Sequence, residues 1–187
     1  HPVAHANPST SPSAGCRNPT LKCVNFRGNV QTRLKKLDEG VVDATLLAKA
    51  GLNRMDMTQH ITNVLEWDEM LPAVAQGAIG IQCRDGDEKI MTYLDALNCQ
   101  NTKLAVDCER AFLAALDGNC RTPIAGQAKL LDDGKLYFKG LIAKPDGTML
   151  FETERTGSAD DAVKMGTEAG EELKAKDANC QSLTEDL

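Results

Sequence analysis

Three strand-like runs joined by two tight turns, with a helical pattern on either side, constrain the fold of this chain most strongly. The runs are IAGQAKLL (124–131), KLYFKGLIAK (135–144) and MLFETER (149–155), and the turns between them are DDG (132–134) and PDG (145–147). Asp-Gly turns of this kind join neighbouring antiparallel strands. The pattern therefore predicts a three-stranded antiparallel meander.

A helix is predicted on each side of this meander. Residues 101–118 have Thr102 as a suitable N-cap, Gly118 as a stop, and one apolar face made of Leu104, Cys108, Phe112, Ala115 and Leu116. A last helix is predicted from about Ala159 to Lys176. Two helices can cover one face of such a sheet, so residues 99–180 are predicted to form a small α+β domain.

The preceding part, residues 18–98, has a different organisation. LKCVNF (21–26) and VVDATLLA (41–48) read as strands, and the segment between them (27–40) has the apolar period of a helix. A strand, a helix and a strand in about 30 residues indicate a βαβ unit with parallel strands. A parallel fragment needs further strands to close its sheet, so we expect a truncated α/β portion that exposes apolar strand edges.

The rest of this portion is predicted from shorter patterns. Residues 49–54 read as a turn and a short helix, and DEKIMTYLDALN (87–98) as an amphipathic helix. Between them, LPAVAQGAIGIQCR (71–84) reads as a loop or hinge followed by a strand at 78–82. The first residues, 1–17, are rich in Pro, Ser and Ala and are predicted to be disordered.

Composition excludes several classes of function. The formal net charge of −6 argues against a nucleic-acid-binding protein, and no run of 18 apolar residues suggests a membrane span. The seven cysteines include no C-x-x-C pair, and none of the three histidines lies near a cysteine pair, which argues against structural zinc and for a reducing compartment. The chain begins with His1, so a natural start and any targeting peptide are expected upstream.

Two segments contain candidate anion-binding groups. In RGNVQTR (27–33), Arg27 and Arg33 flank a helix start where Gly28 permits close backbone approach and Asn29 is a suitable cap. Two guanidinium groups near a helix N-terminus can bind a carboxylate or phosphate, and the alternative is two solvated surface arginines. Gln76, in the hinge-like segment, can hydrogen-bond a ligand, and the alternative there is a plain tight strand entry.

Cys120 is the candidate nucleophile. It lies in DGNCRTPIAG (117–126), in the turn between a predicted helix and a predicted strand, beside small residues that leave a thiol accessible. An inert loop thiol is the alternative. The sequence contains no P-loop, no dinucleotide-binding glycine motif after a strand, no G-x-S-x-G and no H-E-x-x-H.

Taken in order, these segments resemble the porphobilinogen deaminase (hydroxymethylbilane synthase) family over residues 18–177. The segments that carry the resemblance are RGNVQTRLKKLDEG, ATLLAKAGLNRM, LPAVAQGAIGIQCR, LAVDCERAFLAALDGNCRTPIAG, FKGLIAKPDG and VKMG. The amino-acid sequences of these segments are most similar to those of the plastid type of plants and algae. The resemblance implies two α/β domains built like periplasmic binding proteins, of which 18–98 is a part, and a C-terminal cofactor-anchoring domain at 99–180.

The resemblance also implies a reaction and roles for residues. Porphobilinogen units are joined head to tail, with loss of ammonia, on a dipyrromethane cofactor held by a thioether, which Cys120 would form. The pyrrole carboxylates would be held by Arg27, Arg33 and Arg54, and the cofactor cleft would be lined by Gly28, Gly51 and Gln76. Asn119 and Ala75 stand where many family members have glycine.

No catalytic residue is expected within this chain, because the family's catalytic aspartate lies in a first domain that the resemblance does not cover. Asp38, Asp43 and Asp107 read as ordinary surface or capping residues, and no metal is expected. The family is usually monomeric. A plastid stroma location is implied, with the cytoplasm as the alternative.

Two hypotheses remain open from the sequence. In the first, the chain is part of an active enzyme whose N-terminal sequence is missing, and the isolated chain has no turnover. In the second, the chain is a non-catalytic fragment or remnant that only binds cofactor or pyrrole carboxylates.

Overall fold

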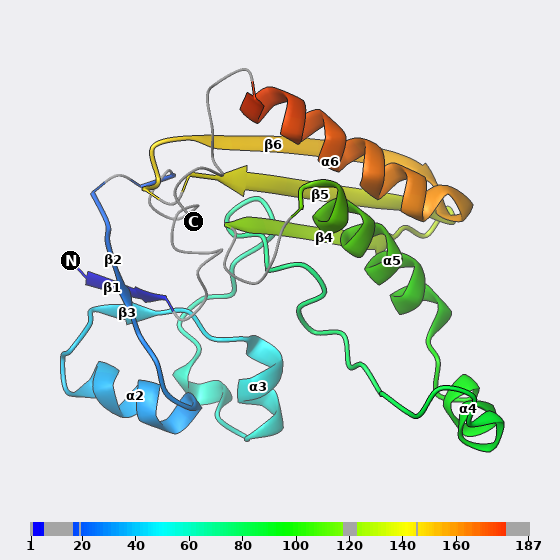
Figure 1. The fold of residues 1–187 in the computed structure, drawn as a ribbon. Coiled ribbons are helices and arrows are strands. Elements are labelled where there is room, and N and C mark those ends of the chain that lie inside the picture. The colour runs from blue at the N-terminus through cyan, green and yellow to red at the C-terminus, as the bar shows by residue number, and fades with distance from the viewer. Residues whose placement is uncertain (1, 6–16, 19, 118–122, 145, 179–187) are drawn as a thin grey trace.

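The computed structural model describes residues 2–5, 17–18, 20–117, 123–144 and 146–178 (Figure 1). The described chain forms two sheets: a parallel one near the N-terminus and an antiparallel one near the C-terminus, each with three strands. This mixed α/β architecture confirms the predicted fold class.

The C-terminal domain is a helix, an antiparallel meander and a helix, as predicted. Helix α5 spans Gln100–Ala115, and strands β4 (Ile124–Leu130), β5 (Lys135–Ala143) and β6 (Leu150–Ser158) pair in the order β4-β5-β6. A short 3-10 turn, η2 (Ala159–Asp161), leads into helix α6 (Ala162–Ala178). Figure 1 shows α5 and α6 side by side on one face of this sheet.

Apolar side chains from both helices fill the space above the sheet. Phe112 of α5 and Phe138 of β5 are fully buried and meet edge to face, with ring centroids 5.0 Å apart. Cys108 and Leu173 are buried in the same cluster. Aromatic pairs in this geometry add about 0.5–1.5 kcal/mol beyond the burial of their area, so this contact helps to fix both helices on the sheet.

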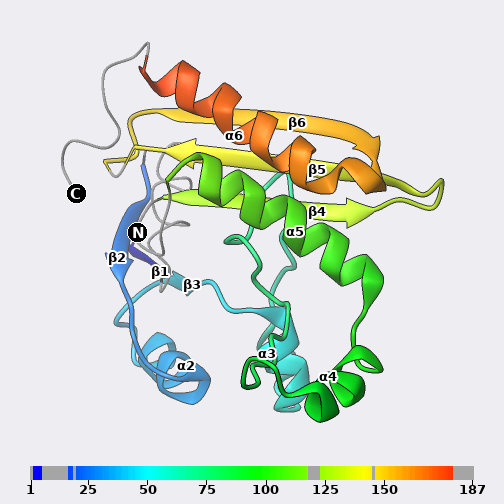
Figure 2. The ribbon, with the colours of Figure 1, turned by 45° about the vertical axis from the view of Figure 1, so that its right-hand side comes forward.

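The opposite face of the sheet is covered by residues that precede the domain. Leu71 is 1% exposed and packs with Ala125 and Leu141, while Trp67 stacks on Tyr137 with centroids 6.2 Å apart. Figure 2 shows the chain rising from α3 to this sheet and returning towards α4. The segment around Leu71 therefore joins the two parts of the molecule.

The N-terminal part contains the predicted βαβ unit. Strand β2 (Lys22–Asn25), helix α2 (Val30–Asp38) and strand β3 (Ala44–Thr45) follow one another, and both strands run parallel to a third, β1 (Pro2–His5), which lies between them. Helix α3 (Lys49–Arg54) and the 3-10 turn η1 (Thr58–His60) follow. The prediction of parallel strands is confirmed, although β3 is much shorter than 41–48.

The prediction of disorder for 1–17 is wrong for Pro2–His5. These residues have no apolar period, yet β1 pairs with β2 on one side and with β3 on the other. Main-chain hydrogen bonds require no particular side chains, so a strand without a sequence signal can form where two edges are open.

The strand predicted at 78–82 is absent from the described chain. Residues 78–84 form no strand, and Ile79 is 85% exposed. Alternating apolar residues form a strand only beside a partner strand, and none of the described strands lies against this segment. Helix α4 (Glu88–Asp95) follows as predicted and lies away from the antiparallel sheet (Figure 1). No helix in the described residues is long and apolar enough to cross a membrane.

Candidate functional site

A cavity of about 860 Å³ lies between the N-terminal part and the segment that contacts the C-terminal sheet. Its wall combines apolar, cationic and amide side chains from α2, from the chain around β3, from α3 and from the two segments 60–65 and 70–76. The lining residues are Arg33, Leu34, Leu37, Asp43, Ala44, Thr45, Leu46, Leu47, Ala48, Lys49, Leu52, His60, Ile61, Thr62, Asn63, Val64, Leu65, Met70, Leu71, Pro72, Ala73 and Gln76.

Arg33 is placed on the cavity wall by the start of α2. Asn29 caps this helix, since its side-chain oxygen accepts the Thr32 amide at 2.8 Å. Gly28 has φ +138°, and a Cβ there would lie 3.0 Å from Thr32 Cγ2, so the tight entry to the helix favours glycine. Arg33 is half-buried, and its Nε is a buried donor without a hydrogen-bond partner among the described residues.

An unpaired buried donor of this kind is uncommon in folded proteins, because losing its hydrogen bond costs about 1–3 kcal/mol. An anionic ligand in the cavity would supply the missing acceptor. A carboxylate suits a guanidinium best, because its two oxygens match two parallel N–H donors. The cavity therefore has the features of a site for an organic acid.

Gln76 reaches the same cavity from a tight turn. Its amide N–H donates to the Ala73 carbonyl at 3.0 Å, and its side-chain Oε1 accepts the Ala73 N–H at 3.3 Å. Ala75, between them, has φ +58°, a left-handed conformation that most residues avoid. With its oxygen used inside the turn, the Gln76 side chain keeps its NH₂ group as a donor towards a ligand.

The other expected contacts are not brought to this cavity in the described structure. Arg27 is exposed, and its carbonyl accepts Lys36 Nζ at 3.2 Å. Arg54 is the exposed last residue of α3, and Gly51 has open space where a Cβ would stand. Gly28 permits the tight backbone turn into α2, but it does not line the cavity wall. Of the expected site residues, the cavity contains Arg33 and Gln76.

Several lining residues were not among the site residues expected from the sequence. Lys49 and His60 add basic groups, Asn63 adds an amide, and Asp43, which read as a surface residue, is the one acid among the described lining residues. They flank β3 or lie near η1, and only the folding of 43–65 around α3 brings them together. The one signal in the sequence that could have pointed to Lys49 is the apolar run directly before it, because that run also lines the cavity.

The cavity is tied to the C-terminal domain by Glu109 and Pro72. Glu109, on α5, is 5% exposed and accepts the Ala75 amide at 2.6 Å and the Ala128 amide at 2.8 Å. Burial raises the pKa of Glu109, while the two amide hydrogen bonds partly oppose that rise. The Pro72 carbonyl accepts the Gly126 amide at 3.1 Å.

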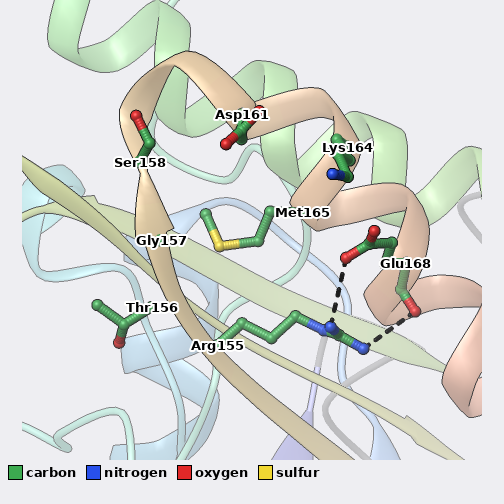
Figure 3. Close-up of a pocket in the computed structure, with 8 residues that line it drawn as sticks. All are labelled: Arg155, Thr156, Gly157, Ser158, Asp161, Lys164, Met165 and Glu168. Carbon is green, nitrogen blue, oxygen red and sulfur yellow. Dashed lines mark hydrogen bonds and ion pairs between the residues drawn. The ribbon is translucent and has the colours of Figure 1, made fainter.

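A second, smaller cavity of about 260 Å³ lies between β6 and α6 (Figure 3). Arg155 also has a buried Nε without a partner among the described residues, but its two terminal nitrogens are paired, with the Glu168 carboxylate at 3.6 Å and the Glu172 carboxylate at 2.7 Å. Lys164 and Asp161, of opposite charge, also line it. With its charges balanced, this cavity is a poorer site for an anion than the one at Arg33.

Cys120, the expected cofactor anchor, lies outside the described residues, in the connection between α5 and β4. Of the four described cysteines, Cys83, Cys99 and Cys108 are free thiols. No group of three or more His, Cys, Asp or Glu within the described ranges is arranged to hold a metal ion.

The fold and cavity define a class: an α/β portion with a cavity lined by cationic, amide and apolar side chains, followed by a small α+β domain. Two family models match the chain. The porphobilinogen deaminase, dipyromethane cofactor binding domain, matches residues 13–92, and the porphobilinogen deaminase, C-terminal domain, matches residues 103–175. The chain belongs to the porphobilinogen deaminase family.

Individual relatives agree with the family models. The chain is 62% identical over 160 residues to the chloroplastic porphobilinogen deaminase of Oryza sativa subsp. japonica, and the aligned region covers 84% of this chain and 45% of the rice protein. It is 60% identical over 154 residues to the chloroplastic enzyme of Pisum sativum, covering 81% and 42%. It is 51% identical over 160 residues to the Paracoccus denitrificans enzyme, covering 86% and 51%. The chain spans about half the length of these curated relatives.

Proposed function

We propose that this chain is the substrate- and cofactor-holding part of a hydroxymethylbilane synthase, and that its cavity binds pyrrole carboxylates. The observation that carries the proposal is the half-buried Arg33, which shares a cavity with Gln76 and whose buried Nε has no partner in the part of the chain that the structure describes. Porphobilinogen carries an acetate and a propionate on one flat ring. The positive charges of Arg33 and Lys49 match the carboxylates, and the leucines of the wall provide an apolar surface for the ring.

In this proposal each lining group has a distinct task. Arg33 binds one carboxylate through its guanidinium, and Gln76 donates a hydrogen bond from its side-chain NH₂ group. Lys49 supplies positive charge for a second carboxylate, and the His60 ring can offer it a hydrogen bond. Apolar residues such as Leu52, which is 4% exposed, exclude water from the ring. The residues of this chain thus bind and orient the substrate.

The family model's description supports a dipyrromethane cofactor, and the cavity fits one because it holds an unpartnered guanidinium donor and ample volume. We propose that Cys120 anchors it by a thioether. When bound, the dipyrromethane supplies the pyrrole primer to which porphobilinogen units are added with loss of ammonia. Arg27, Arg54 and Gly51, which do not line the described cavity, are proposed to contact the longer pyrrole chain.

The anchor is tested by the intact mass of the purified chain and a peptide map around Cys120. The expected result is a mass increment equal to one dipyrromethane, lost in Cys120→Ser. An unmodified Cys120 thiol in protein made beside an active tetrapyrrole pathway would contradict anchoring by this chain alone.

The cavity is tested by calorimetric titration of the chain with porphobilinogen. Arg33→Ala is expected to weaken binding by roughly 10- to 100-fold, because a charged hydrogen-bond partner is lost. Lys35→Ala is the matched control: it removes one positive charge from the same helix, but Lys35 is 77% exposed and pairs with Glu39. Equal loss in both variants, or none in Arg33→Ala, would contradict the assignment.

The alternative is a chain that binds pyrrole carboxylates without catalysis. It is favoured by the scarcity of acids at the cavity, where Asp43 is the one carboxylate among the described lining residues. For the 187-residue chain by itself we propose binding without turnover. Release of ammonia from porphobilinogen by the purified chain would contradict this. On the strength of the chloroplastic relatives we propose a plastid location. We also propose a monomeric state without a membrane or nucleic-acid partner, as the family resemblance implies.

A further inference from the structure

Glu109 is a buried carboxylate whose two oxygens connect two separate parts of the chain. Its Oε2 accepts the N–H of Ala75, 34 positions earlier, at 2.6 Å, and its Oε1 accepts the N–H of Ala128, 19 positions later, at 2.8 Å. A carboxylate that is 5% exposed needs such partners, because desolvation disfavours its charge. Each oxygen is therefore committed to one backbone amide.

The two amides belong to different structural units. Ala128 lies in β4 of the C-terminal sheet, while Ala75 lies in the turn whose neighbours Ala73 and Gln76 line the large cavity. Glu109 itself is not among the lining residues. Its side chain thus links the cavity wall to the C-terminal domain without contacting the cavity.

The turn needs this link because its backbone is strained. A non-glycine residue at φ +58°, as Ala75 is, costs of the order of 1 kcal/mol and persists only when its surroundings hold it. Leu71 and Val74 pack against the C-terminal domain, and the Pro72 carbonyl bonds to the Gly126 amide. These contacts fix the chain up to Val74, and the Glu109 bond fixes the next residue, directly before Gln76.

We propose that Glu109 is a positioning residue for the pyrrole-binding cavity. By holding the Ala75 amide it sets the left-handed turn, and the turn presents the Gln76 side chain to a ligand carboxylate. This inference deepens the proposed function and rests on it.

The variant Glu109→Gln tests the link with almost no change of shape. A glutamine side chain has one acceptor oxygen and one NH₂ donor, so one of the two amides must face a donor. In the 187-residue chain we expect exchange of the Ala75 amide hydrogen to become at least about tenfold faster, and the Gln76 side-chain NH₂ signals in the NMR spectrum to shift. Porphobilinogen binding should weaken by roughly 3- to 10-fold.

A double-mutant cycle separates positioning from a merely structural role. If Glu109 acts through Gln76, Glu109→Gln weakens porphobilinogen binding in the wild-type background but has little further effect in Gln76→Ala. The control is Glu172→Gln, since Glu172 bonds Thr153 and Arg155 at a distance from the cavity. That variant should leave the Ala75 exchange rate and the Gln76 signals unchanged.

The outcomes are distinct. Equal weakening in both backgrounds, or unchanged Ala75 exchange in Glu109→Gln, would overturn the positioning role. If the wild-type chain does not bind porphobilinogen, the proposed function fails, and Glu109 is then judged by Ala75 exchange and the Gln76 signals alone. If Glu109→Gln does not fold, as judged by Trp67 fluorescence, the same cycle is run with Glu109→Asp, whose shorter side chain keeps the charge but cannot span both amides.

Discussion

Cys99 and Cys108 lie nine residues apart in opposite chemical environments. Cys99 is exposed at the N-cap of α5. Interaction with the Thr102 side chain lowers the pKa of its thiol most, and interaction with the Thr102 backbone lowers it further. Cys108, on the buried face of α5, is fully buried, and burial raises the pKa of its thiol to about 12. Since the thiolate is the reactive form, the two residues should differ strongly in reactivity.

We therefore predict that iodoacetamide at neutral pH labels Cys99 first among the four described cysteines and leaves Cys108 unlabelled in the folded chain. Peptide mapping by mass spectrometry after timed quenching measures each rate. Addition of denaturant should make Cys108 labelling comparable with that of the others. Labelling of Cys108 at the rate of Cys99 without denaturant would contradict the burial of this thiol.

Glu109 should give the stability of the chain a specific dependence on pH. Burial raises its pKa in the folded state above the value in the unfolded chain, so the folded state binds the proton more tightly. Its contribution to the free energy of unfolding is then fully present below the unfolded pKa and is lost as pH rises through the raised value. The window begins near the ordinary glutamate pKa of about 4.3 and extends upward.

The measurement is urea unfolding followed by the fluorescence of Trp67, the chain's one tryptophan, for wild type and Glu109→Gln over this window. The free energy of unfolding of the wild type, relative to the variant, should decrease as pH rises. A relative stability that increases with pH would mean that the two amide bonds outweigh burial and lower the pKa of Glu109.

At the scale of elements, α5 and α6 are packed too closely for side chains at two glycines of α6. A Cβ on Gly166 would lie 2.0 Å from the Cys108 carbonyl oxygen, and one on Gly170 would lie 2.6 Å from the Ala115 Cβ. Both neighbours are parts of α5 that cannot rotate away. The helix pair can therefore adopt this spacing only with glycine at these positions.

Gly166→Ala should lower the free energy of unfolding of the C-terminal domain by about 2–4 kcal/mol, because the helices must separate. Gly51→Ala is the comparison: Gly51 also lies in a helix, but nothing is within 4 Å of its would-be Cβ. It should be neutral or stabilising by about 0.5–1 kcal/mol. Urea titrations measure both, and equal effects would contradict the close packing of α5 and α6.

Elements were predictable from the sequence where local signals decide them. The DDG and PDG turns and the helical periods predict the C-terminal meander and its helices within a few residues. The cap of α5 was mistaken, because Thr102 lies inside the first turn and its interaction is with Cys99. Two errors show the limit of local patterns: a strand was predicted at 78–82 but does not form, and strand β1 forms but was not predicted. Strand pairing depends on neighbours in space, which a local pattern does not contain.

For the whole molecule, the family resemblance supplied Arg33 and Gln76, and the fold brings both to one cavity. It does not bring Arg27 or Arg54 there, and it adds Lys49 and His60, to which the sequence analysis gave no role. A cavity wall is assembled from segments that meet only after folding, so spacing along the chain could not identify it. Glu109 was hidden for the same reason, since its partners are two backbone amides.

The central claim is that a pyrrole carboxylate binds in the cavity at Arg33. The most direct test is a crystal structure of the chain grown with porphobilinogen. The account predicts electron density for the ligand in the cavity of about 860 Å³, with a carboxylate on the Arg33 guanidinium and the Gln76 amide within hydrogen-bond distance. Porphobilinogen bound instead in the cavity between β6 and α6, or seated with its carboxylates away from Arg33, would contradict it.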